Sequence, residues 1–231
     1  MPRAAIDIGS NSILLTIVDG DRVLHDEART AALGRGLGDR GLFSPDRMAR
    51  ATEVLSDYVE IAGSHGIGAC AIEAVATSAA RRAMNAETFF DRVRQRLGLR
   101  VRIISGGEEA CLTWLGGQHE LELPSGPILG VDLGGGSTEL ILGRARRLEQ
   151  RISLEVGSVR LTEAYLEHDP DGRIHAETLP PMLEHIEGEL ERFSLDTRPW
   201  GIVGIGGTIT TLVALRLGLQ HFDATRVHGA R

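Results

Sequence analysis

Lysine is absent from this sequence of 231 residues, in which all 25 basic side chains are arginine. A Walker A nucleotide-binding loop needs a lysine on the β- and γ-phosphates, so the absence of lysine excludes this class of NTPase. Any site that binds phosphate groups must therefore use arginine, backbone N–H groups, hydroxyl groups or a metal ion.

Cysteine and long apolar runs are also scarce. The separation of Cys70 and Cys111, the only cysteines, fits no metal-binding or redox motif, so we expect two reduced thiols and a cytoplasmic protein. No run approaches the ~18 consecutive apolar residues of a membrane span. We expect no secretory signal, because the N-terminus has no cationic start followed by an apolar core. The net charge of −7 argues against extensive nucleic-acid binding.

The sequence does contain two similar series of apolar segments, separated near Pro124. The first series predicts strands at 4–8, 12–18, 22–30, 69–76 and 100–104, and helices that begin after the N-caps Ser44 and Asn85 and at Ser105. The second series predicts strands at 128–132, 138–142, 148–156 and 200–205, and helices at 158–166, 178–193 and after Gly207.

The two series indicate an internal duplication. Aligning Asp7 with Asp132 gives a period near 125 residues. We therefore predict an α/β protein with two duplicated domains, 1–124 and 125–231, that face each other across a cleft. The second series lacks the last strand and helix of the first, so we expect the second domain to be truncated at its C-terminus.

Glycine-containing hairpin turns occupy equivalent places in the two series: "DIGSNS" begins at Asp7 and "DLGGGSTE" at Asp132. Such turns let backbone N–H groups converge on an anion, and glycine lets a phosphate group approach the main chain. The predicted phosphate contacts in these turns are Gly9, Ser10, Asn11, Ser12, Gly134, Gly135, Gly136, Ser137 and Thr138. Asp132 and Glu139 lie at the rims of the second turn, placed for a hydrated Mg²⁺. The alternative is two tight turns whose glycines only supply positive φ.

A third glycine loop, "GIGGTITT", leads from a predicted strand into a predicted helix. A helix N-terminus offers free N–H groups and a partial positive charge, so Gly206, Gly207 and Thr208 are further predicted phosphate contacts. The alternative is an ordinary strand-to-helix turn that Thr208 caps. The loop is not a dinucleotide-binding fingerprint, because the third glycine of that fingerprint is missing.

The motif "SGGEEA" contains two adjacent glutamates with different predicted roles. Ser105 and Glu108 have the spacing of a capping box, which gives Glu108 a structural role. Glu109 has no such role and lies about 100° further round the helix. A carboxylate there can accept a proton from an attacking water or hold that water in line, so we predict that Glu109 is catalytic.

The segment "ATSAARRAMN", from Ala76 to Asn85, follows a predicted strand. Open α/β sheets bind ligands at the carboxyl ends of their strands, which favours a functional role for this segment. We predict that Arg81 holds phosphoryl oxygens during catalysis, and that Thr77 and Ser78 are further phosphate contacts.

Together these motifs resemble the exopolyphosphatase / guanosine pentaphosphate phosphohydrolase (Ppx/GppA) family. Seven of them occur in the expected order: "DIGSNS", "ATSAARRAMN", "SGGEEA", "DLGGGSTE", "GSVRLTE", "GIGGTITTLVAL" and "RVHG". The resemblance implies the fold of actin, sugar kinases and heat-shock-protein ATPases. It also implies Mg²⁺-dependent removal of the terminal phosphate from inorganic polyphosphate, or of the 5′-terminal phosphate from guanosine pentaphosphate. The family's catalytic glutamate falls on Glu109, and its metal-associated carboxylates fall on Asp132 and Glu139.

One departure from the family stands beside the catalytic motif. The family commonly has an arginine after "EEA", whereas this chain has Cys111, which removes one positive contact. Two alternative functions remain open: an ATP-dependent kinase or ATPase of the same superfamily, and a non-catalytic protein that binds polyphosphate or guanosine polyphosphates. The expected partner is one of these small anions, with no nucleic acid and no membrane, and a homodimer stays open.

Overall fold

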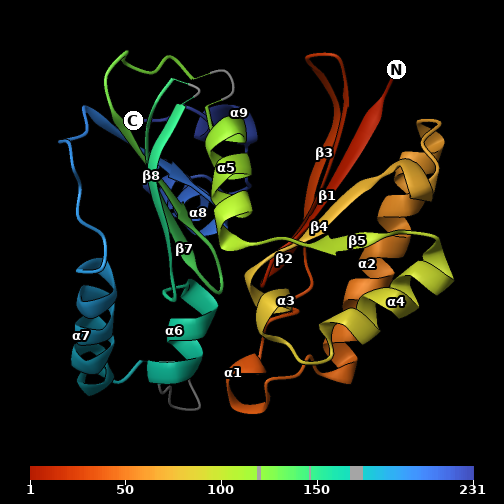
Figure 1. Ribbon diagram of the computed structural model, residues 1–231, viewed down its shortest axis with the longest axis horizontal. Coiled ribbons are helices and arrows are strands. Elements are labelled where there is room, and N and C mark those ends of the chain that lie inside the picture. The colour runs from red at the N-terminus through yellow and green to blue at the C-terminus, as the bar shows by residue number, and fades with distance from the viewer. Residues whose placement is uncertain (119–120, 146, 167–173) are drawn as a thin grey trace. The chain divides into compact units, whose positions relative to one another are not determined.

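The computed structural model describes residues 1–118, 121–145, 147–166 and 174–231 of the chain. These residues form two compact units, Met1–Ser105 and Gly106–Arg231. This boundary differs from the one expected near Pro124, because the helix that begins at Gly106 packs on strands of the second unit. Each unit contains one sheet with helices packed on it (Figure 1).

The sheet of the first unit has five strands in the order β3-β2-β1-β4-β5. The strands β1 (Arg3–Ile8), β2 (Ser12–Asp19) and β3 (Arg22–Thr30) form an antiparallel meander. The strand β4 (Glu73–Ala76) pairs parallel with β1, and β5 (Val101–Ile103) pairs parallel with β4. The five strands predicted along this half of the chain are confirmed, and the structure adds their order in the sheet.

The main helices of the first unit, α2 (Pro45–Ser64) and α4 (Ala86–Leu97), pack with the sheet in one hydrophobic cluster. The shorter helices are α1 (Leu37–Arg40), the 3₁₀ turn η1 (Ala69–Ala71) and α3 (Ser78–Arg82). Along α2 the buried side chains recur every three or four residues, at Ala51, Leu55, Tyr58 and Ala62. This spacing confirms the apolar face that the sequence predicts.

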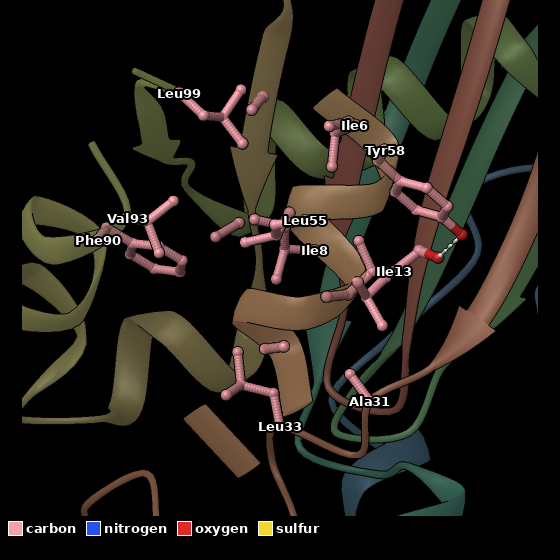
Figure 2. Close-up of a cluster of buried hydrophobic side chains, with 14 of the residues drawn as sticks. Ile6, Ile8, Ile13, Ala31, Leu33, Leu55, Tyr58, Phe90, Val93 and Leu99 are labelled. Atoms are coloured by element: carbon pink, nitrogen blue, oxygen red, sulfur yellow. Dashed lines mark hydrogen bonds between the residues drawn. The ribbon is translucent and has the colours of Figure 1, made fainter. Parts of the chain in front are cut away.

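Figure 2 shows a hydrogen bond inside this core, between the hydroxyl group of Tyr58 and Ile13. The Tyr58 hydroxyl group donates to the carbonyl oxygen of Ile13 at 3.0 Å and lies 3.2 Å from that of Glu27. The residue is fully buried, and burial, together with the negative charge of Glu27, raises the pKa of Tyr58 to about 12. The side chain therefore joins α2 to β2 and β3.

The structure corrects several local predictions. The strand expected at 69–76 begins as η1 and becomes extended only in β4. Ser44 and Asn85 occupy N-cap positions, but neither side chain makes the capping hydrogen bond. The Asn85 amide instead makes two hydrogen bonds to the backbone of Phe43. It accepts from the Phe43 N–H at 2.9 Å and donates to the Phe43 carbonyl oxygen at 3.0 Å. A long-range contact therefore replaces the local cap.

The sheet of the second unit has the order β8-β7-β6-β9 among the described residues. The strands β6 (Ile128–Leu133), β7 (Thr138–Arg144) and β8 (Arg147–Leu154) form a second antiparallel meander, and β9 (Gly201–Ile205) pairs parallel with β6. In this described part, no strand pairs with the outer edge of β9, where β5 flanks β4 in the first unit.

Helices pack on both faces of the second sheet. On one face, Ala110 and Trp114 of α5 (Gly106–Gly116) contact a cluster that includes Ile128 and Ile141. On the other face, α6 (Ser158–Tyr165) and α7 (Leu179–Leu190) pack against a cluster that includes Leu140. Adjacent residues of β7 therefore point to opposite faces, as strand geometry requires. The remaining helices are η2 (Ala176–Thr178), α8 (Gly207–Arg216) and α9 (Ala224–Val227).

The first hairpin turn of each unit closes in the same way. The N–H of Gly9 donates to the carbonyl oxygen of Ser12 at 3.0 Å, and the N–H of Gly134 donates to that of Ser137 at 3.0 Å. The two pairs are separated by the 125 residues that align Asp7 with Asp132. The duplication predicted from the sequence is therefore visible at the level of single hydrogen bonds.

Candidate active site

A row of polar side chains crosses three neighbouring strands of the second sheet. Asp132 of β6 pairs with Glu139 of β7, and Glu139 pairs with Ser153 of β8. Residues directly opposite each other in a sheet point to the same face. Ile141, two residues after Glu139, packs against α5, so the row lies on the face that α5 covers.

Glu139 is the most enclosed member of this row, with only 2% of its surface exposed. Its Oε1 atom accepts hydrogen bonds from the hydroxyl groups of Ser137 at 2.9 Å and Ser153 at 2.8 Å. Burial, followed by the negative charge of Glu109 and a smaller effect of Asp132, raises the pKa of Glu139 to about 7, whereas the hydrogen bonds from Ser153 and Ser137 act to lower it. A positive charge beside this carboxylate would favour its ionised form.

Asp132 lies beside Glu139 and is also held by a hydroxyl group. Thr113 of α5 donates to its Oδ2 atom at 3.2 Å. Burial raises the pKa of Asp132, the Thr113 hydrogen bond lowers it, and the charge of Glu109 raises it. The Asp132 carboxyl group is therefore fixed from α5 as well as from its own strand.

Glu109 stands in the first turn of α5, next to Ala110, which packs against the sheet. Its charge acts on both Asp132 and Glu139, so the three carboxyl groups predicted from separate motifs lie close together. Glu108 and Glu109 are both partly buried, and the shared helix places their side chains on different faces.

The glycine loop of the second unit is fixed by α6. The carbonyl oxygen of Gly134 accepts from the N–H of Ser158, that of Gly135 from the N–H of Val159, and that of Gly136 from the Arg160 side chain, at 2.9–3.0 Å. In a trans peptide the N–H points opposite to the carbonyl group. The N–H groups of residues 135–137 therefore point away from α6, as an anion-binding turn requires.

The third glycine loop contacts the same region. A Cβ atom on Gly206, whose φ is 92°, would lie 2.7 Å from Oδ1 of Asp132. The Thr208 hydroxyl lies 3.3 Å from the Ser158 hydroxyl, which itself lies 3.4 Å from the Gly134 carbonyl oxygen. Gly206 and Thr208 therefore lie beside Asp132 and the second hairpin turn, and Gly207 is between them in the chain.

The alternative role for the hairpin glycines, supply of positive φ, is not what the structure shows. Gly9, Gly134, Gly135 and Gly136 all lie outside the positive-φ group, to which Gly206 belongs. Close packing instead accounts for a glycine at position 157, where a Cβ atom would lie 2.6 Å from backbone atoms of Gly135 and Gly136.

The predicted residues of the first unit form their own group. Ser10, Thr77 and Ser78 are buried, and a Cβ atom on Gly34 would touch both Ser10 and Ala79 of α3. The first hairpin turn is held to the following segment, because the N–H groups of Ala31 and Ala32 donate to the Asn11 carbonyl oxygen. The side chains of Asn11 and Ser12 lie 3.4 Å apart.

Arg81 lies in α3, and one of its guanidinium nitrogens donates to the carbonyl oxygen of Ile104 at 3.1 Å. This bond places the exposed Arg81 side chain near the carboxyl end of β5, within the first unit.

The two units differ in the chemistry of their equivalent strands. Asp7 of β1 is opposite Leu14 of β2, whereas Asp132 of β6 is opposite Glu139 of β7. The carboxylate pair is therefore a property of the second copy alone. A divalent cation suits that pair, because Mg²⁺ takes oxygen ligands and is often held by one or two carboxylates plus water and phosphate oxygens.

The structure also identifies hydroxyl groups that the sequence analysis did not select: Thr113, Ser153 and Ser158. Thr113 follows Glu109 by one helical turn, a spacing that puts both on one face of α5. Ser153 could not be identified from the sequence, because its contact with Glu139 depends on the register between β7 and β8. In the described part of the chain no group of three or more His, Cys, Asp and Glu side chains is arranged to hold a metal ion, so a cation would rest on two carboxylates at most.

The chain resembles proteins of one family over almost its whole length. The sequence profile of the "Ppx/GppA phosphatase family" matches residues 14–221. "Exopolyphosphatase 2" of Mycobacterium tuberculosis is 38% identical over 99% of this chain and 75% of that protein. "Guanosine-5'-triphosphate,3'-diphosphate pyrophosphatase" of Vibrio parahaemolyticus is 32% identical over 97% of this chain and 45% of that protein.

The crystal structure of the Aquifex aeolicus member of the Ppx/GppA protein family superposes with a TM-score of 0.77 and 35% identity, covering 100% of this chain and 74% of that one. The predicted fold class, two duplicated α/β domains, is confirmed by the two sheets and by the likeness to this family structure. The cleft between them stays a prediction. None of the helices in the described ranges has both the length and the apolar character needed to cross a membrane.

Proposed function

The chain belongs to the Ppx/GppA phosphatase family and is a hydrolase of phosphoanhydride bonds, and we propose that it removes the terminal phosphate from short inorganic polyphosphate or from guanosine pentaphosphate. The observation that carries this proposal is the group formed by Glu109, Asp132 and Glu139 beside the glycine loop of residues 134–137. We place the reaction in the cytoplasm, because Cys70 and Cys111 are free thiols.

Glu109 is the proposed general base. It holds a water molecule in line with the terminal phosphorus atom and takes one of its protons. The water oxygen forms a new bond to phosphorus, and the bridging P–O bond to the rest of the chain breaks. The leaving oxygen takes the electron pair of the broken bond, and inorganic phosphate is released.

The N–H groups of the glycine loop bind the oxygens that carry this charge. Because residues 135–137 are fixed in place by α6, their N–H groups need no reorganisation during the reaction. Thr208 and the loop at Gly206 contribute donors from the start of α8. In the first unit, the proposal assigns phosphate binding to Arg81 and to the first hairpin turn.

The proposed cofactor is Mg²⁺, held by Asp132 and Glu139. When bound, it supplies positive charge that polarises the phosphoryl oxygens and stabilises the charge of the leaving group. The hydrogen bonds of both carboxyl groups support this assignment, since Ser137 and Ser153 orient Glu139 while Thr113 orients Asp132.

The test is release of inorganic phosphate, measured colorimetrically with short polyphosphate, long polyphosphate and guanosine pentaphosphate in parallel, with and without Mg²⁺. We expect release from at least one of these substrates and a loss of release when Mg²⁺ is chelated. Absence of release from all of them, or transfer of phosphate to an acceptor other than water, would overturn the proposal.

A further inference from the structure

Arg151 lies beside the candidate active site on the face of the sheet that α5 covers. It is opposite Ile141 in the strand register and two residues before Ser153 on β8. Residues two apart on a strand point to the same face, so Arg151 and Ser153 share it. The guanidinium group therefore comes from the strand that also holds Glu139 in position through Ser153.

The guanidinium group of Arg151 lies along the first turns of α5. One of its nitrogens is 2.9 Å from the Cys111 sulfur, and a Cβ atom on Gly107 would come within 3.0 Å of the other. Gly107 and Cys111 are four residues apart, so they lie on one side of the helix. Gly107 has no side chain and that of Cys111 is small, so the helix leaves the space that Arg151 occupies. Glu109 lies between these two residues in the chain.

Arg151 has no carboxylate partner within the part of the chain that the structure describes. Its one bonded neighbour there is the Cys111 thiol, which is a weak acceptor. Other arginines of the second unit behave differently: Arg144 pairs with Glu149, and Arg192 pairs with Glu189. The exposed guanidinium of Arg151 is thus available to an anion in solution.

The charge of the site explains what such a cation does. Glu109, Asp132 and Glu139 together repel a substrate that carries several negative charges. Arginine presents five N–H donors in a planar fork that matches two oxygens of a phosphoryl group. A guanidinium beside the carboxyl groups lowers the cost of bringing a phosphate chain to them.

We propose that Arg151 is a substrate-binding residue that contacts the non-bridging oxygens of the phosphate chain and sets the affinity for the substrate. The proposal rests on the function proposed above. In this proposal the positive charge beside α5 comes from Arg151 of β8. The small side chain of Cys111 on α5 leaves space for the guanidinium group.

The test separates binding from turnover, with inorganic triphosphate as the probe. Arg151→Gln is expected to raise KM about tenfold and to leave kcat within about threefold, because a contact made equally in the ground state and the transition state is lost. Arg147→Gln, on the same strand, is the matched control and should stay within about twofold of the wild type. Circular dichroism melting checks that both variants fold.

A charge-relocation variant removes the ambiguity of a simple deletion. Cys111→Arg combined with Arg151→Ser moves the guanidinium group from β8 to α5, and it is expected to recover KM to within about threefold of the wild type. Arg151→Ser alone should remain about tenfold weaker. If Arg151→Gln and Arg147→Gln give the same KM, or if relocation gives no recovery, the inference is wrong.

Calorimetric titration of triphosphate into Glu109→Gln protein distinguishes this failure from failure of the proposed function. Weaker binding when Arg151→Gln is added supports the inference even if the wild-type protein releases no phosphate. Unchanged binding overturns the inference even if the wild-type protein is an active hydrolase.

Discussion

Glu109 and Glu108 are neighbours in the chain with different proposed roles, and this difference is testable at the scale of one carboxyl group. Glu109 acts on Asp132 and Glu139 through its charge, whereas Glu108 has the spacing of a capping residue. Glutamine keeps the shape of glutamate and can still cap a helix, but it cannot take a proton.

Glu109→Gln is expected to lower kcat for phosphate release by roughly 10²–10⁴-fold while triphosphate binding stays largely intact, because the base is lost and the phosphate contacts remain. Glu108→Gln is the control and should retain activity within about twofold, since glutamine also serves in a capping box. Steady-state phosphate release and calorimetric binding give the measurements. Equal losses in the two variants would remove Glu109 from its proposed role.

Tyr58 allows a prediction about pH in the first unit. Its pKa is raised from 10.0 to about 12 by burial, so the folded state keeps the phenol neutral over a range where the unfolded chain ionises it. The stabilisation from the neutral phenol is complete below the unfolded pKa and is lost as pH rises toward the folded pKa. We therefore expect the free energy of unfolding to fall between about pH 10 and pH 12. Urea denaturation at a series of pH values measures this change.

The matched variant is Tyr58→Phe, which removes the hydrogen bond to Ile13 and leaves the ring in place. It should cost about 1 kcal/mol at neutral pH and make the alkaline loss of stability smaller. An unchanged alkaline slope in Tyr58→Phe would show that another group causes the loss.

At the scale of elements, the active site depends on how closely α6 approaches the glycine loop. Three carbonyl groups of residues 134–136 bond to the start of α6, and the absence of a side chain at Gly157 permits this contact. The helix α6 therefore fixes the N–H groups that we propose as phosphate contacts.

Gly157→Ala is expected to push the glycine loop away from α6, because the new methyl group would lie 2.6 Å from backbone atoms of Gly135 and Gly136. We expect a loss of about 1–3 kcal/mol in unfolding free energy and at least a tenfold loss of kcat/KM. Gly188→Ala in α7 is the control, since nothing lies within 4 Å of its Cβ position and alanine favours a helix. Thermal melting and phosphate release measure the two effects, and equal behaviour of the variants would contradict the prediction.

At the scale of the whole chain, the apolar core is unevenly divided. One cluster of buried side chains runs from Ala4 to Leu99 and lies entirely in the first unit. The second unit has two smaller clusters, and large side chains such as Trp200, Ile202 and Leu215 are at least 68% exposed there. Hydrophobic burial is the dominant contribution to stability, so we expect the first unit to be more stable than the second.

The fragment Met1–Ser105 is expected to fold alone and to unfold in one cooperative transition, because its core requires no residue of the second unit. The fragment Gly106–Arg231 should melt at a lower temperature and bind a hydrophobic dye more strongly. Circular dichroism melting of both fragments provides the test. A non-cooperative transition in Met1–Ser105 would contradict it.

Much of the fold follows from local sequence. The spacing of Ala51, Leu55, Tyr58 and Ala62 fixes the buried face of α2, and the short apolar segments at 4–8 and 12–18 give the first two strands. Short pieces such as α3 and η1 were not predicted, since a few residues carry too little periodicity. Asn85 was expected to cap a helix, but its amide bonds to Phe43, which is 42 residues away.

The sequence by itself determined the kinds of chemistry: paired glycine turns, carboxylates at Asp132 and Glu139, and a glutamate at the start of a helix, because each is written in adjacent residues. Tertiary structure alone decided which groups serve those carboxylates. The strand register places Ser153 opposite Glu139, and Thr113 of α5 donates a hydrogen bond to Asp132. The guanidinium group of Arg151 lies beside the Cys111 sulfur. Such contacts join distant parts of the chain, and only the packing of α5 on the second sheet brings them together.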